Sequence, residues 1–308
     1  MNTAPTKISE QVGHGRVFST LRSRVRDYLE LTKPRVNGVV MLVTGVGYTL
    51  GCAGDVSLGA LVGCLFGTAC LAAGASTLNQ VLERRLDGLM LRTENRPLPT
   101  GRLRSGEALV LGLVLGVTGT FSLAVTSNLL TTVLGLATYL SYVLVYTPMK
   151  RRTPHSLFVG AVPGALPPLI GWSAASGTLP LDAWVVFAIL FVWQIPHFTA
   201  IAWFYRDDYR AAEYPMFAVL DQDGRASARM VVWSSLALVV TSFVPLLASG
   251  FSLAYCVGAA LLGLAFLFVV FRFSASIQNF ETSRRFARRV VQVSIVYLPA
   301  LFLLLLVD

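Results

Sequence analysis

The sequence predicts an all-α membrane protein built as a polytopic bundle of nine transmembrane helices. Of the 308 residues, 55% are hydrophobic and only 13% are charged, whereas soluble domains carry about 25% charged residues. Nine apolar stretches approach or reach the length of about 17 to 25 residues that a helix needs to cross a bilayer. The basic residues lie only in alternate connections between these stretches, as expected of a multi-pass protein.

The apolar stretches are rich in Leu, Val, Ala and Gly and lack the regular alternation expected of membrane-spanning strands. We therefore interpret them as helices, which satisfy their own backbone polar groups within lipid. The predicted helices cover residues 36–53, 58–78, 107–125, 129–147, 156–175, 181–203, 230–249, 252–272 and 289–307. This divides the chain into a basic N-terminal tail, 1–35, and a membrane domain, 36–308.

The tail lacks the apolar core of about 7 to 15 residues that marks a secretory signal. It carries seven basic residues, from Lys7 to Arg35. Residues 18–31 are predicted to form an amphipathic helix on the membrane surface, and a disordered basic tail is the alternative for residues 1–17. Acidic residues interrupt the basic run, which argues against a mitochondrial transit peptide.

All 25 Lys and Arg residues lie in the tail, in the loops after the second, fourth, sixth and eighth predicted helices, or at the helix ends that border the last of these loops. The opposite loops hold none. The positive-inside rule then places the N-terminus and the basic loops in the cytoplasm, and Asp308 outside. We expect a bacterial inner-membrane protein with its site on the cytoplasmic face. Because topology explains the net charge of +9, the charge requires no nucleic-acid partner.

The first candidate site continues the second predicted helix. Asn79, Glu83 and Asp87 are spaced i, i+4, i+8, so they share one helix face and span about 12 Å. An amide and two carboxylates are oxygen ligands that suit Mg²⁺ shared with substrate phosphates. Arg92 and Arg96 follow and can grip phosphate oxygens. The alternative is a loop whose charges pair in water, but the adjoining arginines and the membrane-edge position favour a functional site.

The second candidate site follows the sixth predicted helix and repeats this composition. Arg206, Asp207, Asp208 and Arg210 are followed by Glu213. Facing acidic clusters can hold two or more Mg²⁺ ions around one diphosphate, which Arg206 would help to bind.

The sixth predicted helix carries polar residues inside the membrane. An ionisable side chain such as His197 is costly there and is a functional candidate, and Pro196 should kink the helix. The structural alternative is that Gln194 and His197 hydrogen-bond across helices. His155, beside a basic run at the start of the fifth helix, is the second candidate histidine.

The fifth predicted helix is expected to be broken. It contains the glycines and prolines Gly160, Pro163, Gly164, Pro167, Pro168 and Gly171. Two interpretations stay open: small residues that let helices pack closely, or room for a bulky flat ligand.

These segments, in this order, closely resemble the heme-modifying branch of the UbiA-type intramembrane prenyltransferase family. The resemblance runs from LTKPRV at Leu31 to the last helix. NQVLERRLD followed by RTENRPLP is typical of the wider family. YTPMKRRTPHSLFVGAVPGALPPLIGW and WQIPHFTAIAWFYRDDYRAAEYPM resemble the heme branch.

The resemblance implies nine helices around a central cavity, with farnesyl diphosphate and Mg²⁺ at the two acidic clusters. The residues that match the family's catalytic and metal-binding positions are Asn79, Glu83, Asp87, Asp207 and Asp208. Two departures matter. Position 83 is Glu where many relatives have Asp. The second cluster is not the D-x-x-x-D of the quinone branch, so the metal ligands among Asp207, Asp208 and Glu213 stay open, with Asp208 our choice.

The implied reaction transfers a farnesyl group to a vinyl group of heme B, with water addition, to give heme O. His197 or His155 would ligate the heme iron. Lys150 and Arg151 would bind the diphosphate or, with Arg152, the heme propionates. The expected partners are farnesyl diphosphate, heme B and the lipid bilayer, with a terminal oxidase or heme A synthase as candidate protein partners.

Two alternative functions share some of these features. A quinone-type prenyltransferase shares the acidic clusters but takes a phenolic acceptor and has no need for His197. A transporter also has broken helices, but its site should lie near the midplane, whereas the acidic clusters lie at the membrane edge.

Overall fold

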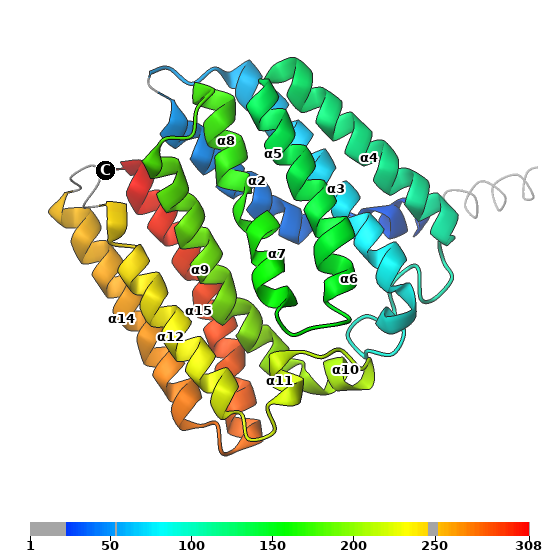
Figure 1. The fold of residues 1–308 in the computed structure, drawn as a ribbon, viewed down its shortest axis with the longest axis vertical. Coiled ribbons are helices and arrows are strands. Elements are labelled where there is room, and N and C mark those ends of the chain that lie inside the picture. Colours follow the sequence, from blue (N-terminus) through cyan, green and yellow to red (C-terminus); the bar gives the residue numbers. More distant parts are fainter. Residues whose placement is uncertain (1–22, 53, 246–251, 308) are drawn as a thin grey trace, which may run out of the picture.

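The structure is a computed structural model that describes residues 23–52, 54–245 and 252–307, and within these ranges it is helical with no strand. Figure 1 shows the long helices running roughly alongside one another, with the short α10 and α11 at one end of the bundle. The helices are α2 (Pro34–Gly51), α3 (Leu58–Asp87), α4 (Ser105–Thr126), α5 (Leu129–Leu140), η1 (Ser141–Tyr146), α6 (Thr147–Met149), α7 (Ser156–Ala165), α8 (Pro167–Ser176), α9 (Leu181–Phe204), α10 (Arg206–Ala211), α11 (Phe217–Leu220), α12 (Arg225–Thr241), α14 (Leu253–Ala275) and α15 (Phe280–Val307).

The all-α membrane fold is confirmed, but the predicted number of nine spans is not. Among the described residues, seven helical segments are long and apolar enough to cross a membrane. Two predicted spans correspond to helices outside this set. α2 carries Arg35 and Asn37 in its first turns. α12 is described over only 17 residues, and part of the predicted span 230–249 lies outside the described residues.

α3 extends the second predicted helix by more than two turns, to Asp87. Its 30 residues correspond to about 45 Å of helix, while the hydrocarbon core is about 30 Å thick. The C-terminal turns therefore extend beyond the lipid, and these turns carry the first candidate site.

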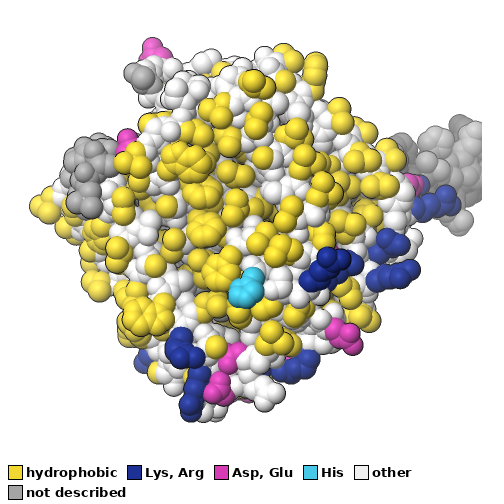
Figure 2. Space-filling model, viewed as in Figure 1, with side chains coloured by type: hydrophobic (Ala, Val, Ile, Leu, Met, Phe, Trp, Pro, Cys, Tyr) yellow, Lys and Arg dark blue, Asp and Glu magenta, His cyan; other side chains and the backbone are white. Residues whose placement is uncertain are grey.

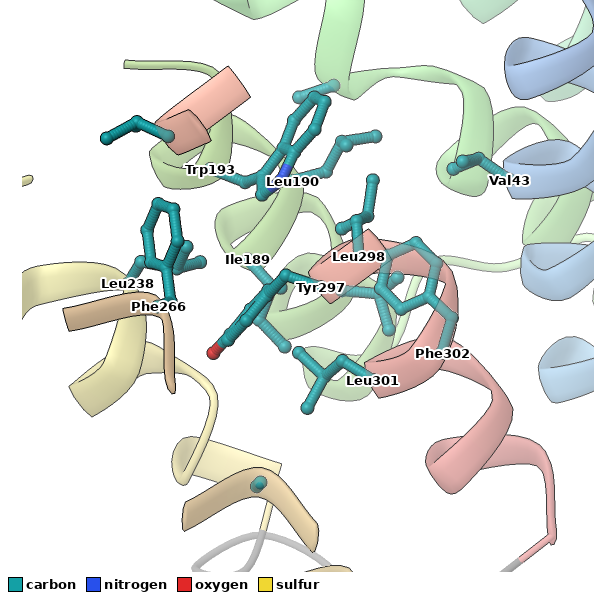
Figure 3. Packing of buried hydrophobic residues seen from close by; sticks show 14 of the residues in the cluster. Val43, Ile189, Leu190, Trp193, Leu238, Phe266, Tyr297, Leu298, Leu301 and Phe302 are labelled. Carbon is teal, nitrogen blue, oxygen red and sulfur yellow. The ribbon is translucent and has the colours of Figure 1, made fainter. Parts of the chain in front are cut away.

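The largest apolar core lies between α2, α9, α12, α14 and α15. Figure 3 shows Ile189 of α9 beside Tyr297 of α15, and Trp193 and Leu301 belong to the same cluster. Each of these residues is at most 8% exposed. Within lipid such packing, rather than exclusion of water, holds the helices together. It fixes the position of α9, whose end leads into the second candidate site.

The fifth predicted helix is broken as expected, into α7 and α8 at Leu166. Its glycines serve close packing. A Cβ added at Gly171 would collide with the Thr44 carbonyl and lie 2.6 Å from the Tyr48 nitrogen. A Cβ at Gly47 would lie 2.7 Å from the Pro168 Cα. α2 and α8 thus meet backbone to backbone, and this contact leaves no room for a flat ligand between them.

Charged side chains gather at one end of the bundle. Figure 2 shows a broad hydrophobic middle, with Lys and Arg toward the end where α10 and α11 lie and along one margin. Residues 23–31 are helical, and Leu31 is buried with Leu98 and Leu103. The rest of the predicted surface helix, 18–22, lies outside the described residues, and its position on a membrane stays a prediction.

The α2–α8 contact predicts opposite effects for two glycines of one helix. Gly47→Ala should destabilise the detergent-solubilised protein by about 1–3 kcal/mol, because the methyl group overpacks a rigid backbone contact. Gly45→Ala is the control, since its added Cβ would meet only Leu65, at 4.0 Å. It should leave the unfolding temperature unchanged or higher, because Ala favours a helix over Gly. Equal unfolding temperatures for the two variants would contradict the close contact.

Candidate functional site

The C-terminal turns of α3 present Asn79, Glu83 and Asp87 on one side, as their spacing predicts, and we call these three residues the acidic face. Their exposed fractions are 3%, 2% and 1%. Taking a carboxylate out of water costs several kcal/mol unless the charge is matched, so this arrangement requires partners.

A polar or basic side chain from another segment meets each member of the acidic face. Lys33 Nζ donates to Asn79 Oδ1 at 3.3 Å, Lys150 Nζ donates to Glu83 Oε1 at 3.1 Å, and Arg96 Nη1 donates to Asp87 Oδ2 at 2.8 Å. Asn79 also donates to the Thr147 hydroxyl at 3.2 Å. The three cations come from the start of α2, the loop after α3 and the loop after α6, so the face collects positive charge from distant parts of the chain.

Lys33 is a site residue that our sequence reasoning missed. It directly precedes α2 and adopts a left-handed backbone, with φ of 48°, which is unfavourable for a residue with a Cβ. Burial, together with the nearby Arg96 guanidinium, lowers the Lys33 pKa to about 8. The available signal was a basic residue immediately before the proline that begins a membrane helix.

Lys150 is the central cation of the site. Burial alone would lower its pKa, but the Glu83 carboxylate outweighs burial and holds the Lys150 pKa well above its ordinary value. The ammonium lies 4.7 Å from the centre of the Tyr214 ring, a cation–π contact. Lys150 therefore stays charged beside the acidic face.

The segment after α9 contacts the loop after α3 through two tyrosines and one carboxylate. The Arg92 guanidinium lies 4.5 Å from the Tyr205 ring centre and donates to the Tyr209 hydroxyl at 3.3 Å. Asp208 Oδ1 accepts a hydrogen bond from the Leu91 nitrogen at 3.1 Å, which ties the second candidate site to the loop after α3.

Other predicted residues are held elsewhere. Asp207 is exposed and pairs with Arg210 at 3.1 Å. The Arg206 guanidinium donates to the Asp221 carbonyl at 2.7 Å. Arg151 donates to the Leu82 carbonyl, and Glu213 is exposed. Their functional roles stay predictions.

The oxygen atoms of the acidic face are suitable ligands for a Mg²⁺ ion that is also coordinated by a diphosphate. Within the described ranges, no three His, Cys, Asp or Glu side chains lie close enough together to hold a metal ion by themselves. Mg²⁺ commonly takes one or two protein carboxylates and completes its octahedron with water and substrate phosphates. Asn79, Glu83 and Asp87 offer oxygen atoms of this kind, next to the cations that a diphosphate requires.

The two candidate histidines lie in different environments. His197 is buried on α9, stacks on Trp193 at 4.5 Å between ring centres, and its Nδ1 lies 2.7 Å from the Ser294 hydroxyl of α15. Gln194 donates across to the Ala161 carbonyl at 2.9 Å. His197 and Gln194 therefore form hydrogen bonds to other helices, as expected if their role is structural. His155 is exposed, with the Phe217 ring 5.5 Å away. Iron ligation by either stays a prediction.

The Glu83–Lys150 pair predicts a strongly destabilising substitution. Lys150→Met should lower the free energy of unfolding by about 3 kcal/mol or more, because it removes the charge that matches a buried carboxylate. Thermal unfolding in detergent measures this, with Arg152→Met as the control at an exposed position nearby. Adding Glu83→Gln to Lys150→Met should recover part of the loss. If Lys150→Met were as stable as Arg152→Met, the pair would not hold the site together.

Comparison with known proteins identifies relatives over nearly the whole chain. A protoheme IX farnesyltransferase from Solibacter usitatus is 44% identical and covers 92% of this chain and 99% of its own. Proteins of the same name from Opitutus terrae and Salinibacter ruber are 40% and 41% identical, covering 93% and 92% of this chain and 95% and 98% of their own.

Solved structures share the fold at low sequence identity. A digeranylgeranylglyceryl phosphate synthase superposes with a TM-score of 0.74 at 15% identity, covering 91% of this chain and 98% of its own. A UbiA homologue from Archaeoglobus fulgidus, bound to GPP and Mg²⁺, gives 0.67 at 18% identity, covering 90% and 99%. Residues 40–303 match the UbiA prenyltransferase family. The chain therefore belongs to the UbiA prenyltransferase family.

Proposed function

We propose that this prenyltransferase transfers the farnesyl group of farnesyl diphosphate to a vinyl group of heme B, with addition of water, to give heme O. The observation that carries the proposal is the 44% identity, along 92% of the chain, to a protein named protoheme IX farnesyltransferase. The acidic face and its cations support the diphosphate half of the reaction.

The diphosphate would bind where cations converge on the acidic face. Asn79, Glu83 and Asp87 would hold Mg²⁺, with Asp208 as a further ligand from the second site. When bound, the metal would neutralise the negative charge that develops as the diphosphate departs. A relative of the same fold was solved with GPP and Mg²⁺, which supports this assignment.

The chain's own cations would orient the leaving group. Lys150 and Arg96 are already held at the acidic face by ion pairs of 3.1 and 2.8 Å, so little reorganisation is needed when a diphosphate arrives. Arg92 is fixed by two tyrosine rings, which presents its remaining donors to the same region. We also assign Arg151 and Arg206 to diphosphate binding, although in this structure both bond to backbone carbonyls.

The heme would lie toward the lipid side of this charged end. Either His197 or His155 would ligate the iron, and Arg152 with its basic neighbours would meet the propionates. The apolar heme ring and the farnesyl chain would lie in the apolar interior, while the diphosphate would stay at the polar end. Keeping water from the apolar part would limit hydrolysis of the farnesyl donor.

We further propose that this multi-pass protein lies in the bacterial inner membrane with its acidic face toward the cytoplasm and its C-terminus outside. The concentration of Lys and Arg at one end of the bundle supports this orientation. Heme O is then released where a terminal oxidase or heme A synthase can take it up.

The direct test is incubation of purified protein in detergent with heme B, farnesyl diphosphate and Mg²⁺, followed by mass spectrometry of the extracted heme. We expect heme to gain one farnesyl group and one water, and chelation of Mg²⁺ to abolish the product. Glu83→Gln and Asp87→Asn should lower turnover by about a hundredfold or more, because each loses charge that positions metal and diphosphate. Unchanged heme, with prenylation of a phenolic acid instead, would overturn the heme assignment.

Heme spectra distinguish the two candidate ligands. His197→Ala should abolish the Soret shift seen when heme B is added, if the buried imidazole gives up its Ser294 contact to ligate iron, while His155→Ala should preserve the shift. The reverse result would assign the exposed histidine. If both variants kept the Soret shift, neither histidine would be the iron ligand.

A further inference from the structure

The Tyr214 hydroxyl is a buried polar group beside the acidic face that the proposed reaction does not use. The residue is 1% exposed, and its hydroxyl has no hydrogen-bond partner. A buried hydroxyl without a partner costs free energy that a phenylalanine at the same position would avoid. Such a group therefore indicates an acceptor that is present only in another state of the protein.

Its surroundings define the chemistry of that acceptor. The ring packs under the Lys150 ammonium at 4.7 Å. The Glu83 carboxylate lies near the hydroxyl and interacts with it weakly, without a hydrogen bond of regular geometry. Both Glu83 oxygens already accept from Lys150, at 3.1 and 3.2 Å. A phenolic hydroxyl keeps its proton at neutral pH, so Tyr214 is available as a hydrogen-bond donor. A hydroxyl donor beside the Lys150 ammonium is suited to bind an anionic oxygen.

The backbone is bent to place this side chain. Glu213 adopts a left-handed conformation with φ of 54°, and the Tyr214 nitrogen donates to the Tyr209 carbonyl at 2.9 Å. Within the described residues, Lys33 is the other non-glycine residue with positive φ, and its ammonium contacts Asn79. Strained residues of this kind persist where function requires the geometry, and both bring a donor to one helix face.

We propose that Tyr214 binds the diphosphate directly, donating its phenolic hydrogen to a phosphate oxygen beside Lys150. This inference rests on the proposed function, since it assumes a diphosphate at the acidic face. The phosphate oxygen would accept the hydrogen bond that the buried hydroxyl lacks. The left-handed turn at Glu213 would keep the ring in place. Tyr214 thus adds a neutral, oriented donor to the charged donors of the site.

The test measures binding of inorganic pyrophosphate with Mg²⁺ to the full-length protein in detergent, by titration calorimetry. Tyr214→Phe removes only the hydroxyl and should weaken binding on the order of tenfold to a hundredfold, the value of a hydrogen bond to a charged group. Its unfolding temperature should stay equal or rise, because an unpaired buried hydroxyl is lost. Tyr297→Phe is the matched control: its hydroxyl lies 2.9 Å from Ser242 in the core, and its loss should leave pyrophosphate affinity unchanged.

The readouts separate this inference from the proposed function. Weaker pyrophosphate binding by Tyr214→Phe supports it even if the wild type modifies a phenolic acceptor instead of heme. Wild-type affinity in Tyr214→Phe overturns it even if the wild type makes heme O. With substrates, the variant should show a raised KM for farnesyl diphosphate and an unchanged heme-binding spectrum. An equal loss of affinity in Tyr297→Phe would also overturn it, because the effect would then not belong to the site.

Discussion

Burial of two carboxylates at the end of α3 is the constraint on which the charged end of this molecule depends. A buried carboxylate is costly without a matched cation. The ion pairs of Glu83 with Lys150 and of Asp87 with Arg96 supply that match. These cations come from two different loops, and Lys33 adds a third from the start of α2. The ion pairs thus tie together segments that the apolar core does not reach, and they preassemble positive charge for an anionic substrate.

The membrane fold places this polar assembly at its edge. α3 is long enough to carry its last turns beyond the hydrocarbon core, and the helices below it hold one another by close contacts such as Gly47 of α2 against Pro168 of α8. The core between α9 and α15 fixes the position of α9, which leads directly into α10 and its Tyr209 (Figure 1). A charged diphosphate and two apolar skeletons can therefore meet at one boundary.

Features set by local periodicity could be predicted from the sequence, and features set by long-range contacts could not. The shared face of Asn79, Glu83 and Asp87 follows from helical spacing, and the break between α7 and α8 follows from its prolines. The Lys33 contact joins residues 46 apart and requires a left-handed backbone that no pattern reveals. For the same reason, the sequence could not decide whether His197 is a heme ligand or a hydrogen-bond partner of another helix. Its contact, Ser294, lies 97 residues away in the chain.

Mn²⁺ spectroscopy can show whether the acidic face binds metal and diphosphate together. Mn²⁺ prefers the same octahedral oxygen ligands as Mg²⁺, and its electron paramagnetic resonance spectrum reports bound ion. We expect tight binding only when pyrophosphate is present, and loss of that bound signal in Glu83→Gln but not in the distant variant Tyr297→Phe. Tight Mn²⁺ binding that is independent of pyrophosphate, or unaffected by Glu83→Gln, would show that the acidic face does not bind the two together.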